Sequence, residues 1–363
     1  MSIDIGIIGL TKSGRTTIFN ALTKGKAETV SSAPHIGIAK VPEPRLSTLA
    51  DMLHPKRVVP AEVRYIDVSS SIKSLAEEKA PTEQFLSQLG NVDALINVVR
   101  AFTNESIPHP EGSLDVKRDI AAMNLELTFY DLAIIERRLK RIEDSLKGAK
   151  PPERQTLLRE QGLLTKIKDN LEKDIPVREV NLTTEEMRAI SGFQFLTTKP
   201  LLIAVNIDEG QLPQAPSLEE EINSHYSRPG CRLVTICGEL EMELGQLDND
   251  AADELRADFG VKEPGLEHII KLSYELLGLI SFFTTVSGEV KAWSIKNGTE
   301  AVKAAGKIHS DMERGFIRAE AISYNDFMKC GSLSEARKKG LLRLEGKKYI
   351  VQDGDVITFL FNV

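Results

Sequence analysis

Two glycines near the start of the chain have the spacing of a loop that binds phosphate groups. Gly9 and Gly14 lie in the stretch GLTKSGRTT, and Thr16 supplies the hydroxyl group that follows in such loops. Backbone N–H groups and a helix N-terminus surround the anionic oxygens in this kind of site. The usual lysine is replaced by Arg15, whose planar guanidinium is bulkier than an ammonium group. The pattern predicts a phosphate site with an intact backbone and an altered side chain.

The elements on either side of this loop support the interpretation. An apolar strand candidate, residues 3–10, precedes it, and a short helical pattern, residues 16–25, follows it. A strand, a loop and a helix in this order disfavour the alternative, a chance glycine-rich turn. Within the loop, Lys12 offers a second positive charge. The loop residues predicted to contact a nucleotide are Lys12, Ser13, Gly14, Arg15, Thr16 and Thr17.

A strand that ends in aspartate is expected some tens of residues after a phosphate loop. Asp67 in the segment RYIDVSS has this position, and with Thr16 it is predicted to hold Mg²⁺ directly or through water. Nucleoside triphosphatases that switch between two states continue with a glycine whose amide senses the γ-phosphate. Ser70 takes that position; it keeps an N–H group but lacks the access of glycine to positive φ. Ser70 is therefore a candidate phosphate sensor.

A third segment, VNIDEG, stands where related folds read the base of a nucleotide. GTP-specific proteins of this kind have Asn-Lys-x-Asp, and the Asp accepts both N–H groups of guanine. Glu209 replaces that Asp, and its extra methylene disturbs the contact, so guanine specificity is not expected. Asp208 is one residue early and faces the other way on a strand; the plainer interpretation is an acidic loop. The predicted base pocket consists of Asn206, Glu209, Ile236 and Cys237.

The elements that must position these residues form an α/β pattern. Several strand candidates are continuously apolar, as expected for strands that are covered on both faces of a mainly parallel sheet. Helical patterns separate most of them, which predicts a doubly wound sheet. The strand candidates are residues 3–10, 62–68, 94–101, 200–208 and 232–237.

A long helical insertion interrupts this pattern. The segment KGAKPPE contains a glycine and two prolines and must break the helix. Two helices with a short turn between them predict an antiparallel coiled-coil hairpin. Its outer faces are densely charged, which leaves two interpretations: a solvated structural arm, or an arm that docks protein or RNA. The seam residues are Leu132, Ile135, Leu139, Ile142 and Leu146 in the first helix, and Leu157, Leu164, Ile167, Leu171 and Ile175 in the second.

The last 83 residues differ in composition and predict a small mixed-sheet domain. From 281 to 363 the chain has 13 Lys and Arg against 10 Asp and Glu, whereas the whole chain has a net charge of −7. The acidic balance argues against nonspecific nucleic-acid binding by the whole molecule. The segment QDGD predicts a turn between two short strands.

Length and composition indicate a globular protein of two or three domains. The chain has 363 residues, 41% of them hydrophobic and 27% charged. Its three cysteines have no zinc or redox spacing, and no apolar run is long enough to cross a bilayer. The start, MSIDIGIIGL, has an acid and a glycine where a signal peptide needs basic residues and an unbroken apolar run. We therefore expect a soluble cytoplasmic protein without membrane contact.

Long segments of the sequence resemble the YchF or Obg-like ATPases, an ATP-preferring branch of the translation-factor-like GTPases. The stretch GLTKSGRTT resembles the family loop GLPNVGKST, and VNIDE resembles its base motif Asn-x-x-Glu. The segment VPEPRLSTLADMLHPKRVVPAEVRYIDV also resembles the family pattern. Further along the chain, EPGLEHIIKLSYELLGLISFFT, AAGKIHSDMERGFIRAEAISYNDF and RLEGKKYIVQDGDV resemble the end of its ATPase domain and its TGS domain. The resemblance covers essentially the whole chain.

The resemblance implies a fold, a ligand and a partner. The fold is a P-loop NTPase with a doubly wound sheet (residues 1–118 and 196–280), an inserted antiparallel coiled coil (119–195) and a C-terminal β-grasp TGS domain (281–363). The ligands are ATP or ADP with Mg²⁺, with slow hydrolysis, and the partner is the ribosome or RNA, bound through the TGS domain and the helical arm.

The resemblance also assigns two further residues. The family is thought to use a histidine from a mobile loop for hydrolysis, and His109 in NESIPHPEG matches it. The plainer interpretation of His109 is a solvated loop residue. Ser31 corresponds to the threonine that usually reaches Mg²⁺ and is a second candidate phosphate sensor.

Departures from the family cluster where the chemistry would occur. Arg15 replaces a lysine, Ser70 replaces the sensor glycine, and Ser71 replaces an apolar residue. Two hypotheses follow: a weakly hydrolysing regulatory ATPase that acts in translation, or a pseudo-NTPase that acts through its TGS and helical parts. An unrelated α/β metabolic enzyme is disfavoured because no other cofactor motif or catalytic pair is visible.

Overall fold

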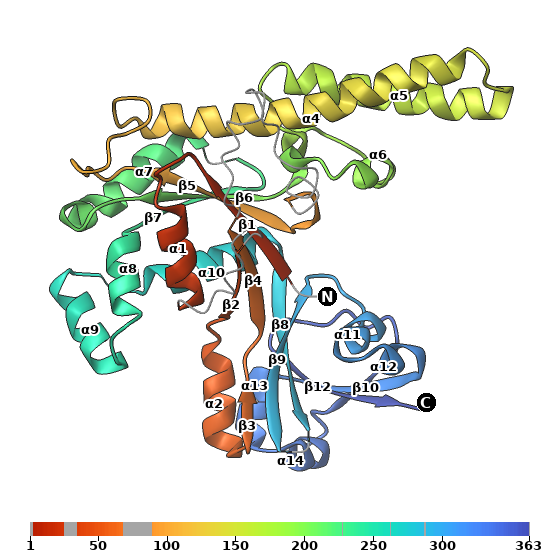
Figure 1. Ribbon diagram of the computed structural model, residues 1–363. Helices are drawn as coiled ribbons and strands as arrows, with labels where there is room; N and C mark the ends of the chain where they lie inside the picture. The colour runs from red at the N-terminus through yellow and green to blue at the C-terminus, as the bar shows by residue number, and fades with distance from the viewer. Residues whose placement is uncertain are drawn as a thin grey trace. The chain divides into compact units, whose positions relative to one another are not determined.

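The chain forms two compact units. The computed structural model describes residues 3–24, 35–67, 89–226, 228–261, 263–286 and 288–362, so Ser31, Ser70 and Ser71 lie outside the described residues. The larger unit comprises Ile3–Ile38 and Arg64–Ile269, and the smaller unit consists chiefly of Ala39–Val63 and Ile270–Val363. Figure 1 follows the chain from red at the N-terminus to blue at the C-terminus.

A six-stranded sheet forms the centre of the larger unit. Its strands are β1 (Ile3–Gly9), β2 (His35–Lys40), β4 (Glu62–Asp67), β5 (Ala94–Arg100), β6 (Leu201–Asn206) and β7 (Cys231–Ile236). They lie in the order β2-β4-β1-β5-β6-β7, and β5 pairs in parallel with β1 and β6, as β6 does with β7. Every residue of β5 and β6 is buried. The mainly parallel sheet predicted from the apolar runs is confirmed.

Helices cover both faces of this sheet. In Figure 1, α4 (Val116–Leu146) and α7 (Ala215–Tyr226) lie above the sheet, and α1 (Arg15–Thr23) lies below it. The other helices are α5 (Pro151–Leu171), α6 (Thr184–Ile190), α8 (Gly238–Leu244), α9 (Asn249–Asp258) and α10 (Gly265–Leu276), and the short 3₁₀ helices are η2 (Val177–Glu179), η3 (Ser191–Phe193), η4 (Leu196–Thr198) and η5 (Glu209–Gln214).

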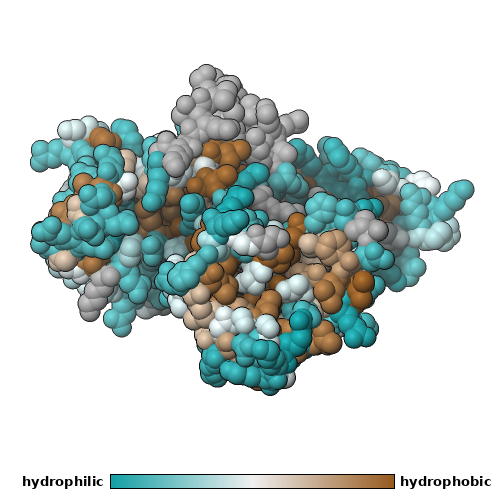
Figure 2. Space-filling view, turned by 90° about the horizontal axis from the view of Figure 1, so that it is seen from below, coloured by the Kyte–Doolittle hydropathy of each residue, from teal (hydrophilic) through white to brown (hydrophobic). Residues whose placement is uncertain are grey.

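The insertion forms an arm of two long helices, α4 and α5. The predicted break is confirmed: α4 ends at Leu146, and α5 begins with Pro151, where a missing N–H group is harmless. The predicted seam packs as one apolar cluster; Ile175 lies beyond the end of α5. Arg138 and Glu160 form a double hydrogen bond across the helices, and the outer end of the arm is hydrophilic in Figure 2. The fully buried seam residues are Ile135, Ile142, Leu164, Ile167 and Leu171.

The smaller unit is built on a second sheet of six strands. Besides β3 (Arg57–Val59), its strands are β8 (Leu279–Val286), β9 (Glu289–Lys296), β10 (Phe316–Ser323), β11 (Arg343–Glu345) and β12 (Asp355–Phe361). Their order is β11-β10-β12-β8-β9-β3, so the early strand β3 lies at one edge, parallel to β9. The helices of this unit are α2 (Pro44–Leu53), α11 (Ala301–Ile308), α12 (Ser310–Arg314), α13 (Tyr324–Cys330) and α14 (Leu333–Lys338).

The smaller unit therefore contains more than the C-terminal segment. Residues 39–63, which the sequence analysis assigns to the NTPase domain, group with it. Arg45 from α2 binds the carboxylate of Asp353 at 2.7 Å, and its guanidinium lies 5.5 Å from the centre of the Phe283 ring. These contacts and the pairing of β3 with β9 hold the early segment in this unit. The three-part division of the sequence stays a prediction.

The predicted turn QDGD is present but does not join a tight hairpin. Gly354 has a φ of 84°, and the N–H group of Asp355 donates to the carbonyl of Gln352 at 3.2 Å. β11 and β12 both pair with β10 instead of with each other. The carboxylate of Asp355 holds the intervening segment, since it accepts hydrogen bonds from the Tyr349 hydroxyl at 2.6 Å and the Gln352 N–H at 3.0 Å.

A buried carboxylate joins the base of the arm to the chain that returns to the sheet. Asp131 of α4 is fully buried and accepts hydrogen bonds from Leu196 N–H and from both the N–H and the hydroxyl of Thr197, at 2.6–2.8 Å. Burial nevertheless raises the pKa of Asp131 from 3.8 to about 6. A folded pKa above the unfolded value means that this group stabilises the fold below pH 3.8 and that the contribution is lost as the pH rises through about 6.

This linkage predicts the effect of replacing Asp131 with asparagine. Between about pH 4 and pH 7, the advantage in unfolding free energy of the wild type over Asp131→Asn should shrink by roughly 2–3 kcal/mol. Urea denaturation at the two pH values measures it. Asp169→Asn on the exposed surface of α5 is the control and should leave the pH profile unchanged. Parallel pH profiles of the wild type and Asp131→Asn would contradict the assignment.

Candidate nucleotide-binding site

The glycine loop has the backbone of a phosphate site. It runs from the end of β1 to the first turn of α1, and Gly14 precedes the helix with a φ of 87°, which favours glycine. A side chain at Gly9 would meet the carbonyl oxygen of Val98 at 2.6 Å, so this position also requires glycine. The first turn of α1 contains no acid. Its free N–H groups and helix dipole therefore favour an anion at the loop.

The side chain of Arg15 turns to the aspartate at the end of β4. Its Nε lies 2.7 Å from Oδ1 of Asp67, a close ion pair without the alignment of a linear hydrogen bond. The hydroxyl of Thr16 donates to Oδ2 of the same carboxylate at 3.2 Å. Asp67 is only 1% exposed. The structure thus brings together three predicted residues, and both oxygens of Asp67 have a partner.

The contact between Arg15 and Asp67 disfavours the predicted metal site of Thr16 and Asp67. Mg²⁺ requires oxygen ligands in close octahedral geometry. The two oxygen-bearing side chains lie together, but the guanidinium of Arg15 already contacts the carboxylate and would repel a divalent cation beside it. Among the residues that the structure describes, no group of three or more His, Cys, Asp or Glu could hold a metal ion. The residues present therefore fit Mg²⁺ poorly while Arg15 keeps this position.

Asn206 braces the glycine loop from the far side. Its amide Nδ2 donates to the carbonyl of Ser13 at 3.1 Å, and its Oδ1 accepts the N–H of Gly238 at 3.0 Å. A side chain on Gly14 would meet the same amide nitrogen at 2.1 Å. Asn206 therefore links the glycine loop to the end of β6 and the start of α8. The sequence predicts a role in the base pocket for Asn206 but not this structural role.

The other predicted base-pocket residues gather at the same end of the sheet. Ile236 pairs with Asn206 in the register of β6 and β7, and both Ile236 and Cys237 are buried. Glu209 starts η5, directly after β6. Burial raises the pKa of the Cys237 thiol, and the negative charge of Glu209 adds to this rise.

His109 is buried beside the loop, and both of its ring nitrogens have partners. Nε2 lies 2.9 Å from Oδ2 of Asp119, and Nδ1 accepts the N–H of Glu111 at 3.1 Å. The side chain is 5% exposed, so the interpretation as a solvated loop residue is wrong. Asp119 also binds Arg118 through its other oxygen. Sequence reasoning missed Asp119, whose only signal is an acid in the first turn of α4.

His109 and Asp119 line a small cavity together with part of the glycine loop. The other lining residues are Leu10, Thr11, Ser13, Asn97, Val98, Val99 and Arg100. The histidine is thus close to the predicted phosphate site. Because its two nitrogens are occupied, it orients no water molecule in this arrangement.

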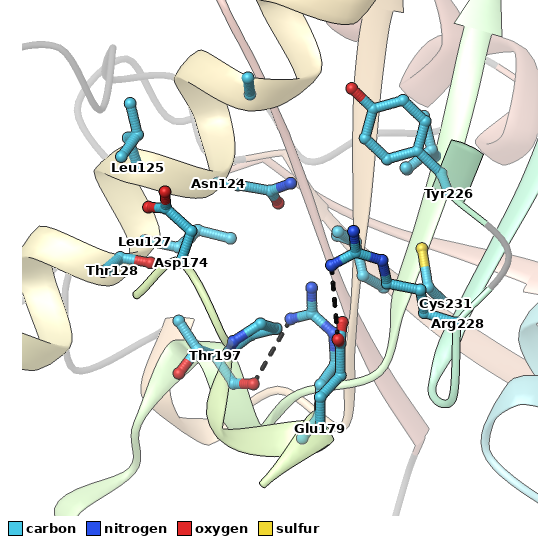
Figure 3. A pocket seen from close by; sticks show the side chains of 15 residues that line it. Asn124, Leu125, Leu127, Thr128, Asp174, Glu179, Thr197, Tyr226, Arg228 and Cys231 are labelled. Carbon is cyan, nitrogen blue, oxygen red and sulfur yellow. Dashed lines mark hydrogen bonds and ion pairs between the residues drawn. The ribbon is translucent and has the colours of Figure 1, made fainter. Parts of the chain in front are cut away.

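A larger cavity of about 240 Å³ lies at the opposite end of the strands (Figure 3). Leu201 and Cys231, the first residues of β6 and β7, line it together with Asn124 of α4. Arg228 reaches the carboxylate of Glu179 across its mouth at 3.5 Å. Nucleotides in open α/β sheets bind at the carboxyl ends of the strands, where the glycine loop is. This cavity is therefore distinct from the candidate nucleotide site.

The fold and the loop together define the class of this protein. A mainly parallel sheet carries a glycine loop between β1 and α1, an aspartate at the end of β4 and an asparagine at the end of β6. These features are those of a P-loop nucleotide-binding protein. No helix in the described part of the chain is long and apolar enough to span a membrane.

Comparison with known proteins narrows the class to one family. The chain is 36% identical to the ribosome-binding ATPase YchF of Bacillus subtilis (strain 168) and 36% identical to that of Escherichia coli O157:H7, each over 100% of both chains. The structure of the Schizosaccharomyces pombe YchF GTPase matches with a TM-score of 0.84 and 29% identity, over 99% of this chain and 98% of that one. Residues 279–362 match the family model YchF-GTPase_C, a protein of unknown function (DUF933). The chain belongs to the YchF family.

The two hydrogen bonds of Asn206 predict the effect of its removal. Asn206→Ala leaves the Ser13 carbonyl and the Gly238 N–H without their partner, which costs about 1–3 kcal/mol of unfolding free energy. We expect nucleotide binding to weaken as well, because the loop loses its brace. Denaturation and calorimetric titration measure the two effects. Asn223→Ala, on the exposed surface of α7, should change neither; equal behaviour of the two variants would argue against the brace.

Proposed function

We propose that this protein binds ATP in preference to GTP, hydrolyses it slowly to ADP and regulates translation through association with the ribosome in the cytoplasm. The observation that carries the proposal is the glycine loop, whose backbone ends on the N-terminus of α1 with Gly14 in a left-handed conformation. Backbone N–H groups supply most of the phosphate contacts in such loops, so the site survives the replacement of its lysine.

The base-reading end supports ATP over GTP. Glu209 stands in place of the aspartate that accepts the two N–H groups of guanine, and it lies near the buried Cys237. Its longer side chain does not reproduce the paired guanine contact. Adenine needs no such paired acceptor. We assign Asn206, Glu209, Ile236 and Cys237 to the base pocket on this ground.

Two contacts support slow hydrolysis. Arg15 is paired with Asp67, so its charge is shared between the carboxylate and any bound phosphate. His109, the proposed catalytic group, must leave Asp119 before its Nε2 can orient a water molecule. Each rearrangement adds to the barrier of the chemical step.

Ribosome association rests on the names of the relatives and on two surfaces. The relatives in Bacillus subtilis and Escherichia coli are named ribosome-binding ATPases. The smaller unit, which contains the predicted TGS domain, exposes apolar side chains of its strands, among them Ile317, Leu344 and Phe361. The arm presents hydrophilic faces. We propose these two surfaces as contacts for ribosomal RNA or protein.

A pseudo-NTPase is the second candidate, and the same two contacts favour it. If Arg15 stays on Asp67 and His109 stays on Asp119, the site binds nucleotide and performs no hydrolysis. The protein then acts through its smaller unit and its arm. Turnover of the wild type separates the two functions.

Calorimetric titration with ATP, ADP and GTP tests the nucleotide proposal. We expect ATP and ADP to bind at least about tenfold more tightly than GTP, a difference of about 1.4 kcal/mol. Asn206→Ala supplies the variant with a loosened loop, and Asn223→Ala on the exposed surface of α7 supplies its control. Tighter binding of GTP than of ATP would refute the assignment of Glu209, and absence of binding by all three would refute the function.

The turnover of His109→Ala tests the catalytic role of the histidine. General acid–base groups contribute about 10²–10⁴-fold, so ATP turnover should fall at least about tenfold while the Kd for ADP stays the same. Ser106→Ala, exposed on the same loop, is the control. A thermal melt of each variant confirms that it is folded. Unchanged turnover would remove His109 from the mechanism, and no wild-type turnover would favour the pseudo-NTPase.

A further inference from the structure

The carboxylate of Asp67 needs a positive charge beside it. An ionised carboxylate that is 1% exposed is costly unless it is paired and hydrogen-bonded. Phosphate-loop proteins supply charge at this position with a bound divalent cation that also neutralises the phosphates. In this chain the guanidinium of Arg15 supplies it, at 2.7 Å from Oδ1.

The chain supplies both partners of Asp67 from consecutive residues. Arg15 and Thr16 belong to the first turn of α1, and each contacts one carboxylate oxygen. The hydroxyl of Thr16, the other predicted metal ligand, is thereby turned to Oδ2. A divalent ion would have to displace both contacts and then remain beside a fixed guanidinium, where Coulomb repulsion opposes it.

Arginine can fill this position in a way that lysine cannot. Its fork has three nitrogens, and the one in contact with Asp67 is Nε. Among the described residues, no contact of its two terminal nitrogens is recorded, and the side chain is 15% exposed. They can therefore donate to phosphate oxygens while Nε stays on the carboxylate. A lysine has a single ammonium group, which cannot contact the carboxylate and the phosphate oxygens in the same way.

We propose that Arg15 takes the place of the divalent cation, so that this site binds the metal-free nucleoside di- or triphosphate. The proposal rests on the nucleotide-binding function proposed above and specifies the form of its ligand. One guanidinium then neutralises the buried Asp67 and contacts the phosphates at the same time. Nucleotide affinity should not depend on Mg²⁺, unlike that of a loop with lysine.

The wild-type protein provides the first test. Calorimetric titration with ADP and with ATP is carried out once in excess MgCl₂ and once in excess EDTA. We expect the two Kd values for each nucleotide to agree within about threefold, which is well below the tenfold step of 1.4 kcal/mol. A loss of tenfold or more in EDTA would overturn the inference and leave the proposed function standing. No binding under either condition would overturn both.

The variant Arg15→Lys provides the second test. Lysine keeps the charge but frees Asp67 for a cation, so binding in EDTA should weaken at least about tenfold relative to wild type and recover when MgCl₂ is added. Arg137→Lys, the same exchange on the exposed surface of α4, should behave as wild type. A circular dichroism spectrum and a melt confirm folding. If Arg15→Lys binds nucleotide in EDTA as tightly as the wild type does, Arg15 does not have the proposed role. If the variant does not fold, the comparison of wild-type Kd values in MgCl₂ and in EDTA decides whether the proposal holds.

Discussion

The buried carboxylate of Asp67 is the constraint on which the candidate site depends. It lies at the end of β4, and among the described residues the first two residues of α1 are its partners. The start of α1 is thereby fixed against the sheet, and so is the direction of the helix amides that face a phosphate. From the other side, Asn206 holds the carbonyl of Ser13. The glycine loop is thus preorganised by contacts within the chain, which lowers the ordering cost of binding an anion.

Three of the buried acids in the larger unit, Asp67, Asp119 and Asp131, are satisfied by different means. Asp67 has a guanidinium and a hydroxyl, Asp119 has His109 and Arg118, and Asp131 has three hydrogen bonds from Leu196 and Thr197, while burial raises its pKa to about 6. At Asp131 the loss of water around the charge outweighs the hydrogen bonds and the positive charge of Arg178. The two acids near the loop hold Arg15 and His109, the side chains proposed for phosphate contact and for catalysis. The same contacts that stabilise the fold thereby oppose rapid turnover.

The sequence predicts most strands of the larger unit and the helical arm well, because these elements depend on local patterns of apolar residues. Five buried strands were found from apolar runs and agree with the structure within about two residues, as does the break between α4 and α5. β2 was missed because its isoleucines, Ile36 and Ile38, are exposed and its short alternating segment lacks an apolar run. The union of residues 39–63 with the C-terminal segment is a long-range contact that no local pattern encodes.

Prediction of the site failed where a side chain had two possible partners. The sequence brings Arg15, Thr16 and Asp67 into one predicted cluster, but it does not say that Arg15 contacts the carboxylate in place of a phosphate. It also assigns Asn206 to the base alone, although its amide braces the loop. His109 was found, but its ion pair depends on Asp119, which becomes a neighbour only when α4 starts at Val116. Such choices are decided by burial and geometry in the folded chain.

The two ends of the nucleotide site lie on different strands, and this separation explains how one end can change while the other is kept. The phosphate end comprises the loop after β1, the first turn of α1 and the end of β4. Arg15, the first residue of α1, and Ser70, beyond the end of β4, depart from the YchF pattern in sequence. The base end belongs to β6 and β7, where Asn206 and Glu209 retain the pattern. The guanidinium of Arg15 gives the phosphate end a positive charge that does not depend on a metal ion. On the proposal that Arg15 takes the place of the metal ion, a γ-phosphate sensor that works through that ion loses its ligand, whereas the residues proposed for the base pocket lie on other strands.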